Sequence, residues 1–208
     1  MKLFLYSAAV MTDHQRTRLC RLVGKDPDAL TIASIVNAVD VIDGSDAWIG
    51  SSTASLPAHH AHITPVDLRR WGTNRAGLYE HLAGHDVIWV SGGNTYYLRW
   101  MMHQTGVDTI IRDLVAQGVV YAGWSAGAIM AGPTLRFFEP VEDMGVVPQV
   151  FYDGLALTDA VPIPHMDLDE FTAGMTEAQR HLTQAGFTTV PLNEDQTLVI
   201  DGDQKTVL

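Results

Sequence analysis

One segment of this chain predicts both an architecture and a chemistry: Val119-Val120-Tyr121-Ala122-Gly123-Trp124-Ser125-Ala126-Gly127-Ala128-Ile129-Met130. It runs from an apolar strand pattern, through Gly-x-Ser-x-Gly, into small residues that suit a helix. A serine in such a tight strand-to-helix turn projects its hydroxyl at the carboxyl end of the sheet, and the flanking glycines leave room for neighbouring backbone. The segment therefore predicts a nucleophile elbow centred on Ser125.

The rest of the chain alternates short apolar runs with stretches of helical spacing, which is typical of a mostly parallel, doubly wound α/β sheet with helices on both faces. The predicted strands are residues 3–8, 30–36, 62–66, 87–90, 119–123, 160–164 and 188–192. The predicted helices are residues 13–23, 74–83, 95–103, 107–117 and 170–185. An Asp-Gly pair within residues 197–207 predicts a C-terminal hairpin at the sheet edge. No repeat or linker divides residues 1–208, so one domain is expected.

Composition and charge favour a small partner. The 208 residues are 47% hydrophobic and 18% charged, as in an ordinary globular protein. Thirteen Lys and Arg against 24 Asp and Glu give a net charge of −11, which argues against nucleic acid or an anionic membrane as the main partner. The apolar segment 1–10 is too short for a membrane span and lacks the features of an export signal, so a cytoplasmic location is expected.

Metal and disulfide chemistry are not expected. The single Cys20 allows neither an intramolecular disulfide nor a CxxC motif, and its helical context predicts a buried thiol. The run His59-His60-Ala61-His62 lacks a helical pair of histidines four residues apart and a nearby thiol, so a solvated loop is expected there.

A nucleophilic serine needs oxyanion donors and a base. The amide of Ala126 is the expected first donor, and the loop Ser91-Gly92-Gly93-Asn94 after a strand is expected to supply the second. Among nine histidines, His165 is the best base because it ends the strand-like run 161–164.

The orienting acid is left open by spacing alone. Asp143 would give the Ser-Asp-His order of α/β-hydrolases, whereas Glu194, which follows the strand 188–192, would give Ser-His-Glu. The first order is that of an esterase, although 208 residues are few for an α/β-hydrolase. A non-catalytic binding protein on an amidotransferase-like scaffold is a further alternative.

Four blocks in a fixed order together resemble the dipeptidase E (aspartyl dipeptidase) and cyanophycinase group of serine peptidases, whose fold is related to class I glutamine amidotransferases. These blocks are Gly92-Gly93-Asn94-Thr95, Gly123-Trp124-Ser125-Ala126-Gly127-Ala128, Pro164-His165 and Pro191-Leu192-Asn193-Glu194. The resemblance implies Ser125 as nucleophile, His165 as base, Glu194 as orienting acid, and the amides of Gly93, with Gly92, and Ala126 as the oxyanion hole. It implies hydrolysis of very short peptides without a cofactor, by a monomer or homodimer.

The resemblance also suggests substrate-binding residues. Asn94 and Asp143 match positions near the site, and Asp143 stays a secondary candidate for the triad. In the helix after the histidine, Arg180 matches a family arginine, but Glu177 stands where the family's first arginine would be. If both faced the pocket, Glu177 would repel an acidic side chain. A preference for neutral or basic first residues, or only weak discrimination, is therefore expected, with Glu177→Arg favouring Asp-X substrates.

Overall fold

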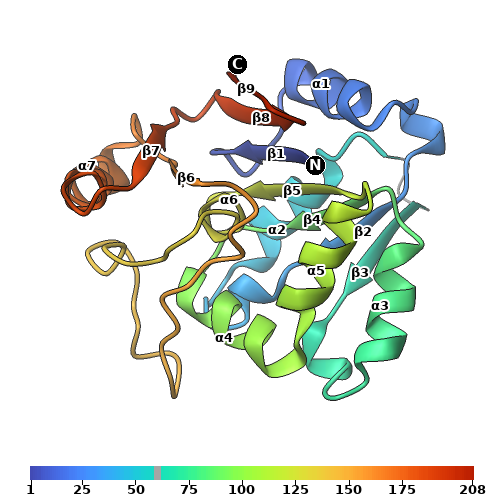
Figure 1. The fold of residues 1–208 in the computed structure, drawn as a ribbon, viewed down its shortest axis with the longest axis horizontal. Coiled ribbons are helices and arrows are strands. Elements are labelled where there is room, and N and C mark those ends of the chain that lie inside the picture. The colour runs from blue at the N-terminus through green and yellow to red at the C-terminus, as the bar shows by residue number, and fades with distance from the viewer. Residues whose placement is uncertain (59–61) are drawn as a thin grey trace.

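A seven-stranded sheet forms the centre of the computed structural model, which describes residues 1–58 and 62–208 (Figure 1). The strand order is β3-β2-β4-β5-β1-β8-β9. The strands are β1 (Lys2–Tyr6), β2 (Ile32–Ile35), β3 (Ile63–Val66), β4 (Val87–Val90), β5 (Val120–Trp124), β8 (Thr197–Asp201) and β9 (Gln204–Val207). Strands β1 to β5 run parallel, while β8 pairs antiparallel with β1 and with β9. The expected mostly parallel sheet with an edge hairpin is confirmed.

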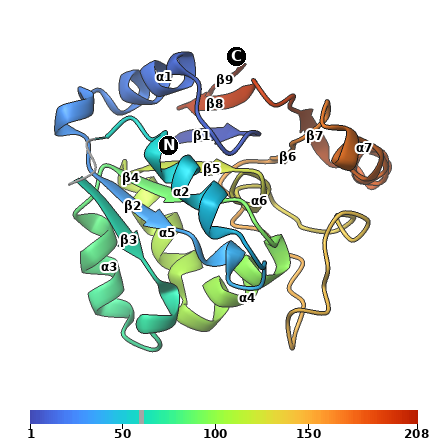
Figure 2. The ribbon, with the colours of Figure 1, turned by 180° about the vertical axis from the view of Figure 1, so that it is seen from behind.

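Helices cover both faces of this sheet, because successive side chains of each strand point to opposite sides. In β1, Leu3 and Leu5 pack into one apolar cluster, whereas Phe4 and Tyr6 pack into the other. Figure 2 shows α3, α4 and α5 gathered on one side of the sheet and α1 on the other. The α-helices are α1 (Asp13–Val23), α2 (Asp46–Ala54), α3 (Arg75–Ala83), α4 (Thr95–Thr105), α5 (Val107–Ala116), α6 (Ala126–Met130) and α7 (Asp169–Gln184).

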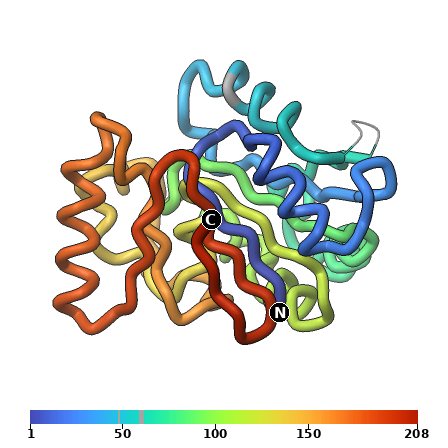
Figure 3. The backbone as a smooth tube through the Cα atoms, turned by 90° about the horizontal axis from the view of Figure 1, so that it is seen from above, coloured from blue at the N-terminus to red at the C-terminus, as the bar shows by residue number. Residues whose placement is uncertain are grey.

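A second, two-stranded parallel sheet lies beside the central one. It consists of β6 (Ala160–Ile163) and β7 (Thr188–Pro191), which α7 connects. Figure 3 shows α7 at the margin of the molecule, beyond the central sheet. The prediction that both strands belong to the main sheet is wrong. The edge of that sheet next to β1 is already occupied by β8, which in turn pairs with β9.

Local differences from the predicted elements have simple causes. Helix α2 is not predicted because its sequence, DAWIGSSTA, has no apolar periodicity. Helix α4 continues beyond the predicted end at residue 103 and stops at Gly106, whose φ of 70° ends the helix in the left-handed region. The histidine-rich loop cannot be compared, because His59 and His60 lie outside the described residues.

Candidate active site

Ser125 stands in the turn between β5 and α6 with an unusual backbone conformation. Its φ is 49° and its ψ is −117°, a region that residues with a side chain rarely adopt and that costs on the order of 1–3 kcal/mol. The Ser125 amide is tied to β1 by a 3.1 Å hydrogen bond to the carbonyl of Tyr6. The turn is therefore held against the end of the neighbouring strand.

The two glycines of Gly-x-Ser-x-Gly are required by close backbone approach. A Cβ on Gly123 would lie 2.4 Å from the carbonyl oxygen of Gly127. A Cβ on Gly127 would lie 2.3 Å from the carbonyl oxygen of Val90 at the end of β4. Neither position has room for a side chain, as the elbow pattern predicts.

His165 lies next to Ser125 and is almost completely buried. Its Nε2 is 2.8 Å from Ser125 Oγ, and the residue is 6% exposed. Its backbone φ is 61°, in the left-handed region. Because His165 follows β6, the imidazole reaches Ser125 from the small sheet, whereas Ser125 belongs to the central sheet.

The carboxylate beside His165 is that of Glu194. Glu194 Oε1 is 2.5 Å from Nδ1 of His165, and the Glu194 amide donates to Asp167 Oδ1 at 2.8 Å. Burial alone would raise the pKa of Glu194, but hydrogen bonds from His165 and Ser7 hold that pKa below its ordinary value. The carboxylate is therefore ionised and accepts the Nδ1 proton, which leaves Nε2 free to accept from Ser125.

The structure brings Asp143, the other candidate acid, to a different wall of the site. Its carboxylate accepts a hydrogen bond from the Gly145 amide at 2.7 Å, and its backbone carbonyl accepts from Asn94 Nδ2 at 2.8 Å. Of the two candidate acids, Glu194 is the one whose carboxylate contacts His165 Nδ1.

The loop after β4 lies next to the elbow, because β4 is paired with β5. Gly93 has a φ of 136°, and a Cβ there would lie 2.4 Å from the carbonyl oxygen of Ala38. A Cβ on Gly92 would lie 2.6 Å from the ring of Trp124. Both positions therefore need glycine, and Gly93 lines the same cavity as Ser125. Asn94 also lines it, but its side-chain oxygen caps α4 by accepting from the Tyr97 amide at 2.8 Å.

These residues surround a cavity of about 460 Å³. Its lining residues are Ala9, Ile42, Gly93, Asn94, Trp124, Ser125, Val141, Glu142, Asp143, His165, Leu168, Glu170, Phe171, Met175 and Glu194. The lining combines apolar side chains with four acidic residues, Glu142, Asp143, Glu170 and Glu194. Among the residues that line it, none is lysine or arginine. Its charge favours a cationic group over an anionic one.

Two residues expected to bind substrate do not line this cavity. Glu177 and Arg180 are exposed on α7, where Glu177 lies 3.6 Å from His181 and Arg180 donates to Gln184 at 3.1 Å. The helical period explains this correction, because at 100° per residue both lie on the face of α7 opposite Met175. Met175 and Phe171 point into the site instead.

Two side chains at this site, Ser7 and Glu142, are not among the predicted site residues. Ser7 follows β1 at the same carboxyl edge as the other site residues, and that position was the available signal. Glu142 accepts hydrogen bonds from the amide and hydroxyl of Thr95 at the start of α4. Burial raises the pKa of Glu142 to about 7, although these hydrogen bonds oppose the rise.

The raised pKa of Glu142 predicts a specific pH dependence of stability. Its folded pKa of about 7 lies above its ordinary value of 4.5, so the folded state keeps a proton that the unfolded state releases. Glu142 therefore contributes stability that is complete below about pH 4.5 and lost as the pH rises through about 7. Relative to Glu142→Gln, we expect the wild type to lose on the order of 2 kcal/mol of unfolding free energy over this range. Urea denaturation of both proteins at pH 4.5 and 8 measures this change in unfolding free energy. Glu170→Gln serves as a control, because it removes an exposed carboxyl group. Parallel pH profiles for wild type and Glu142→Gln would contradict the assignment.

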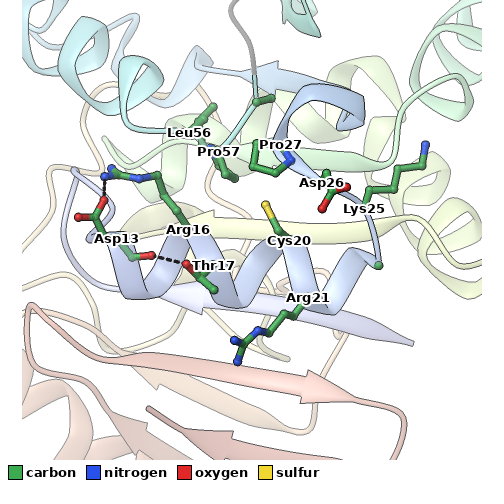
Figure 4. Close-up of a pocket in the computed structure, with 12 residues that line it drawn as sticks. Asp13, Arg16, Thr17, Cys20, Arg21, Lys25, Asp26, Pro27, Leu56 and Pro57 are labelled. Atoms are coloured by element: carbon green, nitrogen blue, oxygen red, sulfur yellow. Dashed lines mark hydrogen bonds and ion pairs between the residues drawn. The ribbon is translucent and has the colours of Figure 1, made fainter.

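A larger cavity of about 900 Å³ lies elsewhere, between α1 and residues 56–58. Figure 4 shows Cys20 pointing from α1 toward Pro27 and Pro57, while Arg21 points away from them. Cys20 is half-buried instead of buried as expected, and burial followed by the charge of Asp26 raises its thiol pKa. The thiol is therefore held in its unreactive protonated form. Ser125 and His165 lie outside this cavity.

Within residues 1–58 and 62–208, none of the helices has the length and apolar character that crossing a bilayer requires. The same residues contain no group of three or more His, Cys, Asp or Glu side chains arranged to hold a metal ion.

Comparison with known proteins shows that this chain is similar to peptidases. The model of peptidase family S51 matches residues 43–208. An uncharacterized peptidase from Pasteurella multocida is 27% identical over 151 residues, which are 71% of this chain and 70% of that protein. Peptidase E from Salmonella arizonae is 36% identical over 121 residues, 57% of this chain and 52% of that protein. The latter match thus spans about half of the relative's length.

Solved structures share the fold over the whole chain. A candidate peptidase E protein from Listeria monocytogenes EGD-e has a TM-score of 0.79 at 22% identity, covering 100% of this chain and 97% of that one. A peptidase from an acI-B1 Actinobacterium has a TM-score of 0.72 at 17% identity, covering 100% and 86%. At these identities the likeness is one of fold.

Proposed function

Because this chain belongs to peptidase family S51, whose dipeptidase E-like members are serine peptidases, we propose that it hydrolyses very short peptides through a Ser125-His165-Glu194 triad and an acyl-enzyme. The observation that carries the proposal is the unbroken chain of contacts from Ser125 Oγ to His165 Nε2 at 2.8 Å and from His165 Nδ1 to Glu194 Oε1 at 2.5 Å. A nucleophile, a base and an orienting acid in this geometry can perform acyl transfer.

The proposed mechanism begins with attack of Ser125 Oγ on the peptide carbonyl carbon while His165 Nε2 takes the hydroxyl proton. Ionised Glu194 holds the ring in the tautomer that accepts this proton and stabilises the imidazolium that forms. The amides of Gly93 and Ala126 donate to the oxyanion. The imidazolium then protonates the leaving amine, and a water activated by His165 releases the acyl group.

Recognition of a free amino terminus would explain a restriction to very short peptides. The α-amino group of a peptide is largely protonated at neutral pH. In this cavity it would meet the carboxyl groups of Asp143, Glu142 and Glu170. An amine held there, close to Ser125, would place one of the first peptide bonds at the nucleophile. This assigns substrate binding to Asp143 and its neighbours on the cavity wall, and not to Glu177 or Arg180.

Two assays on the purified enzyme test the proposed function. The first compares hydrolysis of free dipeptides, their N-acetylated counterparts and simple esters. We expect dipeptides to be cleaved and N-acetylation to abolish cleavage, because acetylation removes the positive charge. The second is labelling of Ser125 by a fluorophosphonate. Cleavage of esters alone would indicate an esterase, and an unlabelled Ser125 would indicate a non-catalytic binding protein.

Charge in the cavity predicts the preferred first residue. An acidic side chain held about 4 Å from a carboxylate of the wall would meet a repulsion of about 4 kcal/mol at an effective dielectric of 20. We therefore expect kcat/KM for Ala-X and Lys-X dipeptides to exceed that for Asp-X by at least about tenfold, the equivalent of roughly 1.4 kcal/mol. Steady-state kinetics on matched dipeptides measures these ratios.

Two variants test whether the cavity wall or the outer face of α7 determines the preference for the first residue. Asp143→Asn should narrow the gap between Ala-X and Asp-X, because it removes one of the repelling charges. Glu177→Arg should change the ratio by less than about threefold, since Glu177 is exposed on the far face of the helix. A preference of the wild-type enzyme for Asp-X would contradict the prediction.

A further inference from the structure

We propose that Ser7 is a positioning residue of the active site, whose single hydroxyl fixes the carboxylate of Glu194 and the backbone of His165 at the same time. This inference rests on the proposed triad. It assigns a role to a fourth side chain, which touches two members of the triad and lies outside the residues that line the cavity.

The hydroxyl of Ser7 acts both as a donor and as an acceptor. Ser7 Oγ donates to Glu194 Oε1 at 2.8 Å and accepts from the backbone amide of His165 at 2.8 Å. The same oxygen lies 3.4 Å from Nδ1 of His165. The residue is 0% exposed, so no solvent molecule can replace these partners without rearrangement.

His165 needs such an anchor because of its backbone. Its φ of 61° is uncommon for a residue other than glycine, and such a conformation persists where the surroundings hold it. Ser7 Oγ accepts a hydrogen bond from the buried His165 amide in place of water, and this hydrogen bond helps to hold the conformation. The conformation in turn directs the imidazole toward Ser125.

Ser7 also links the two sheets from which the triad is assembled. It directly follows β1, and Tyr6 of β1 is paired with Trp124, the residue before Ser125. His165 and Glu194 instead follow β6 and β7 of the small sheet. The hydrogen bonds of Ser7 therefore join the end of the central sheet, where the nucleophile stands, to the base and the acid.

The hydroxyl has an electrostatic effect as well. Its donation to Glu194 is one of the interactions that lower the pKa of that carboxyl against the effect of burial. Without this donor the carboxylate would hold a proton more strongly, and it would also stabilise the protonated imidazole more strongly. Both changes move the acid limb of a pH–rate profile to higher pH.

The test measures the rate at which a fluorophosphonate labels Ser125, from pH 5 to 9, in the full-length wild type and in Ser7→Ala. In this reaction the bond from Ser125 Oγ to phosphorus forms, fluoride leaves, and the hydroxyl proton passes to His165. The assay needs no knowledge of the natural substrate. The other titratable groups around the triad, Glu142, Asp143, Asp167 and Glu170, are present in both proteins.

Ser55→Ala is the matched control. Ser55 is also a buried serine, 6% exposed, whose hydroxyl accepts from the Met11 amide at 3.0 Å and donates to the Ser52 carbonyl at 2.7 Å. Its removal likewise deletes one accepted and one donated hydrogen bond of a buried hydroxyl, but away from the triad and without a charged partner. We expect Ser7→Ala to label about 10- to 100-fold more slowly than wild type, as expected for the loss of a hydrogen bond to a charged group, with its acid limb at higher pH. Ser55→Ala should match the wild type in both respects.

Three outcomes distinguish failure of the proposed function from failure of the role of Ser7. An unlabelled wild type would contradict the proposed function itself. A labelled wild type with the same rate and acid limb in Ser7→Ala would overturn the role of Ser7 alone, as would a rate loss without any shift of the acid limb. If the circular dichroism spectrum shows that Ser7→Ala does not fold, Ser7→Cys carries the same test, because its thiol occupies the site but donates only weakly.

Discussion

Replacing Ser125 with alanine should lower kcat for dipeptide hydrolysis about a millionfold, because loss of a triad nucleophile removes the covalent route altogether. The fold should be retained, since the Ser125 side chain contacts His165 and the turn itself is held by Gly123, Gly127 and the hydrogen bond to Tyr6. Initial rates with the best dipeptide of the screen measure the effect, and circular dichroism confirms the fold.

A matched control for this substitution is Ser34→Ala. Ser34 is a serine of β2 that is 2% exposed and does not line the cavity. We expect its loss to leave kcat within about threefold of the wild type, as for a buried position without a catalytic contact. Peptidase activity that survives in a folded Ser125→Ala protein would rule out Ser125 as the nucleophile.

Glu194→Gln is the substitution with the second largest expected effect, a fall in kcat of about 10³- to 10⁴-fold at nearly constant KM. An ionised carboxylate accepts the Nδ1 proton of His165, whereas the amide of glutamine can donate to Nδ1 and so favour the wrong tautomer. Nε2 would then carry a proton and could not accept that of Ser125. Steady-state kinetics at several pH values separates this effect from a change in binding.

Asp143→Asn tests the alternative acid under the same conditions. Asp143 lies on the cavity wall, where its carboxylate accepts from the Gly145 amide. We therefore expect Asp143→Asn to act mainly on KM for dipeptides, with a much smaller loss of kcat than Glu194→Gln. The reverse order of the two kcat losses would show that Asp143 orients His165.

The choice between these two acids illustrates what spacing along a chain leaves open. His165 and Glu194 are 29 residues apart, and Asp143 lies between Ser125 and His165. Pairing of β6 with β7 aligns Ile163 with Pro191. The residues that follow the two strands are thereby brought to one edge, and these include His165 and Glu194. That pairing depends on contacts in three dimensions that no local pattern encodes.

The sequence did contain a signal for the orientation of α7. Phe171, Met175, Ala178 and Leu182 recur at helical spacing and therefore predict the inward face of this helix. Applied to the same helix, this period places Glu177 and Arg180 outside. Their expected contact with substrate depended on a family resemblance, and the period contradicts it.

Local patterns by themselves determined the sheet, the elbow and the hairpin. The apolar runs predict strands buried on both faces, and Gly-x-Ser-x-Gly after such a run predicts a strained turn, because both signals depend on residues close together in the chain. The tertiary structure alone decided that β6 and β7 leave the central sheet and that Ser7 touches both His165 and Glu194. It also brings Glu194 to His165, a contact that spacing left open and that only the family resemblance implied. Ser7 and His165 are separated by 158 residues, and only the packing of one sheet beside the other brings such distant groups within hydrogen-bonding distance.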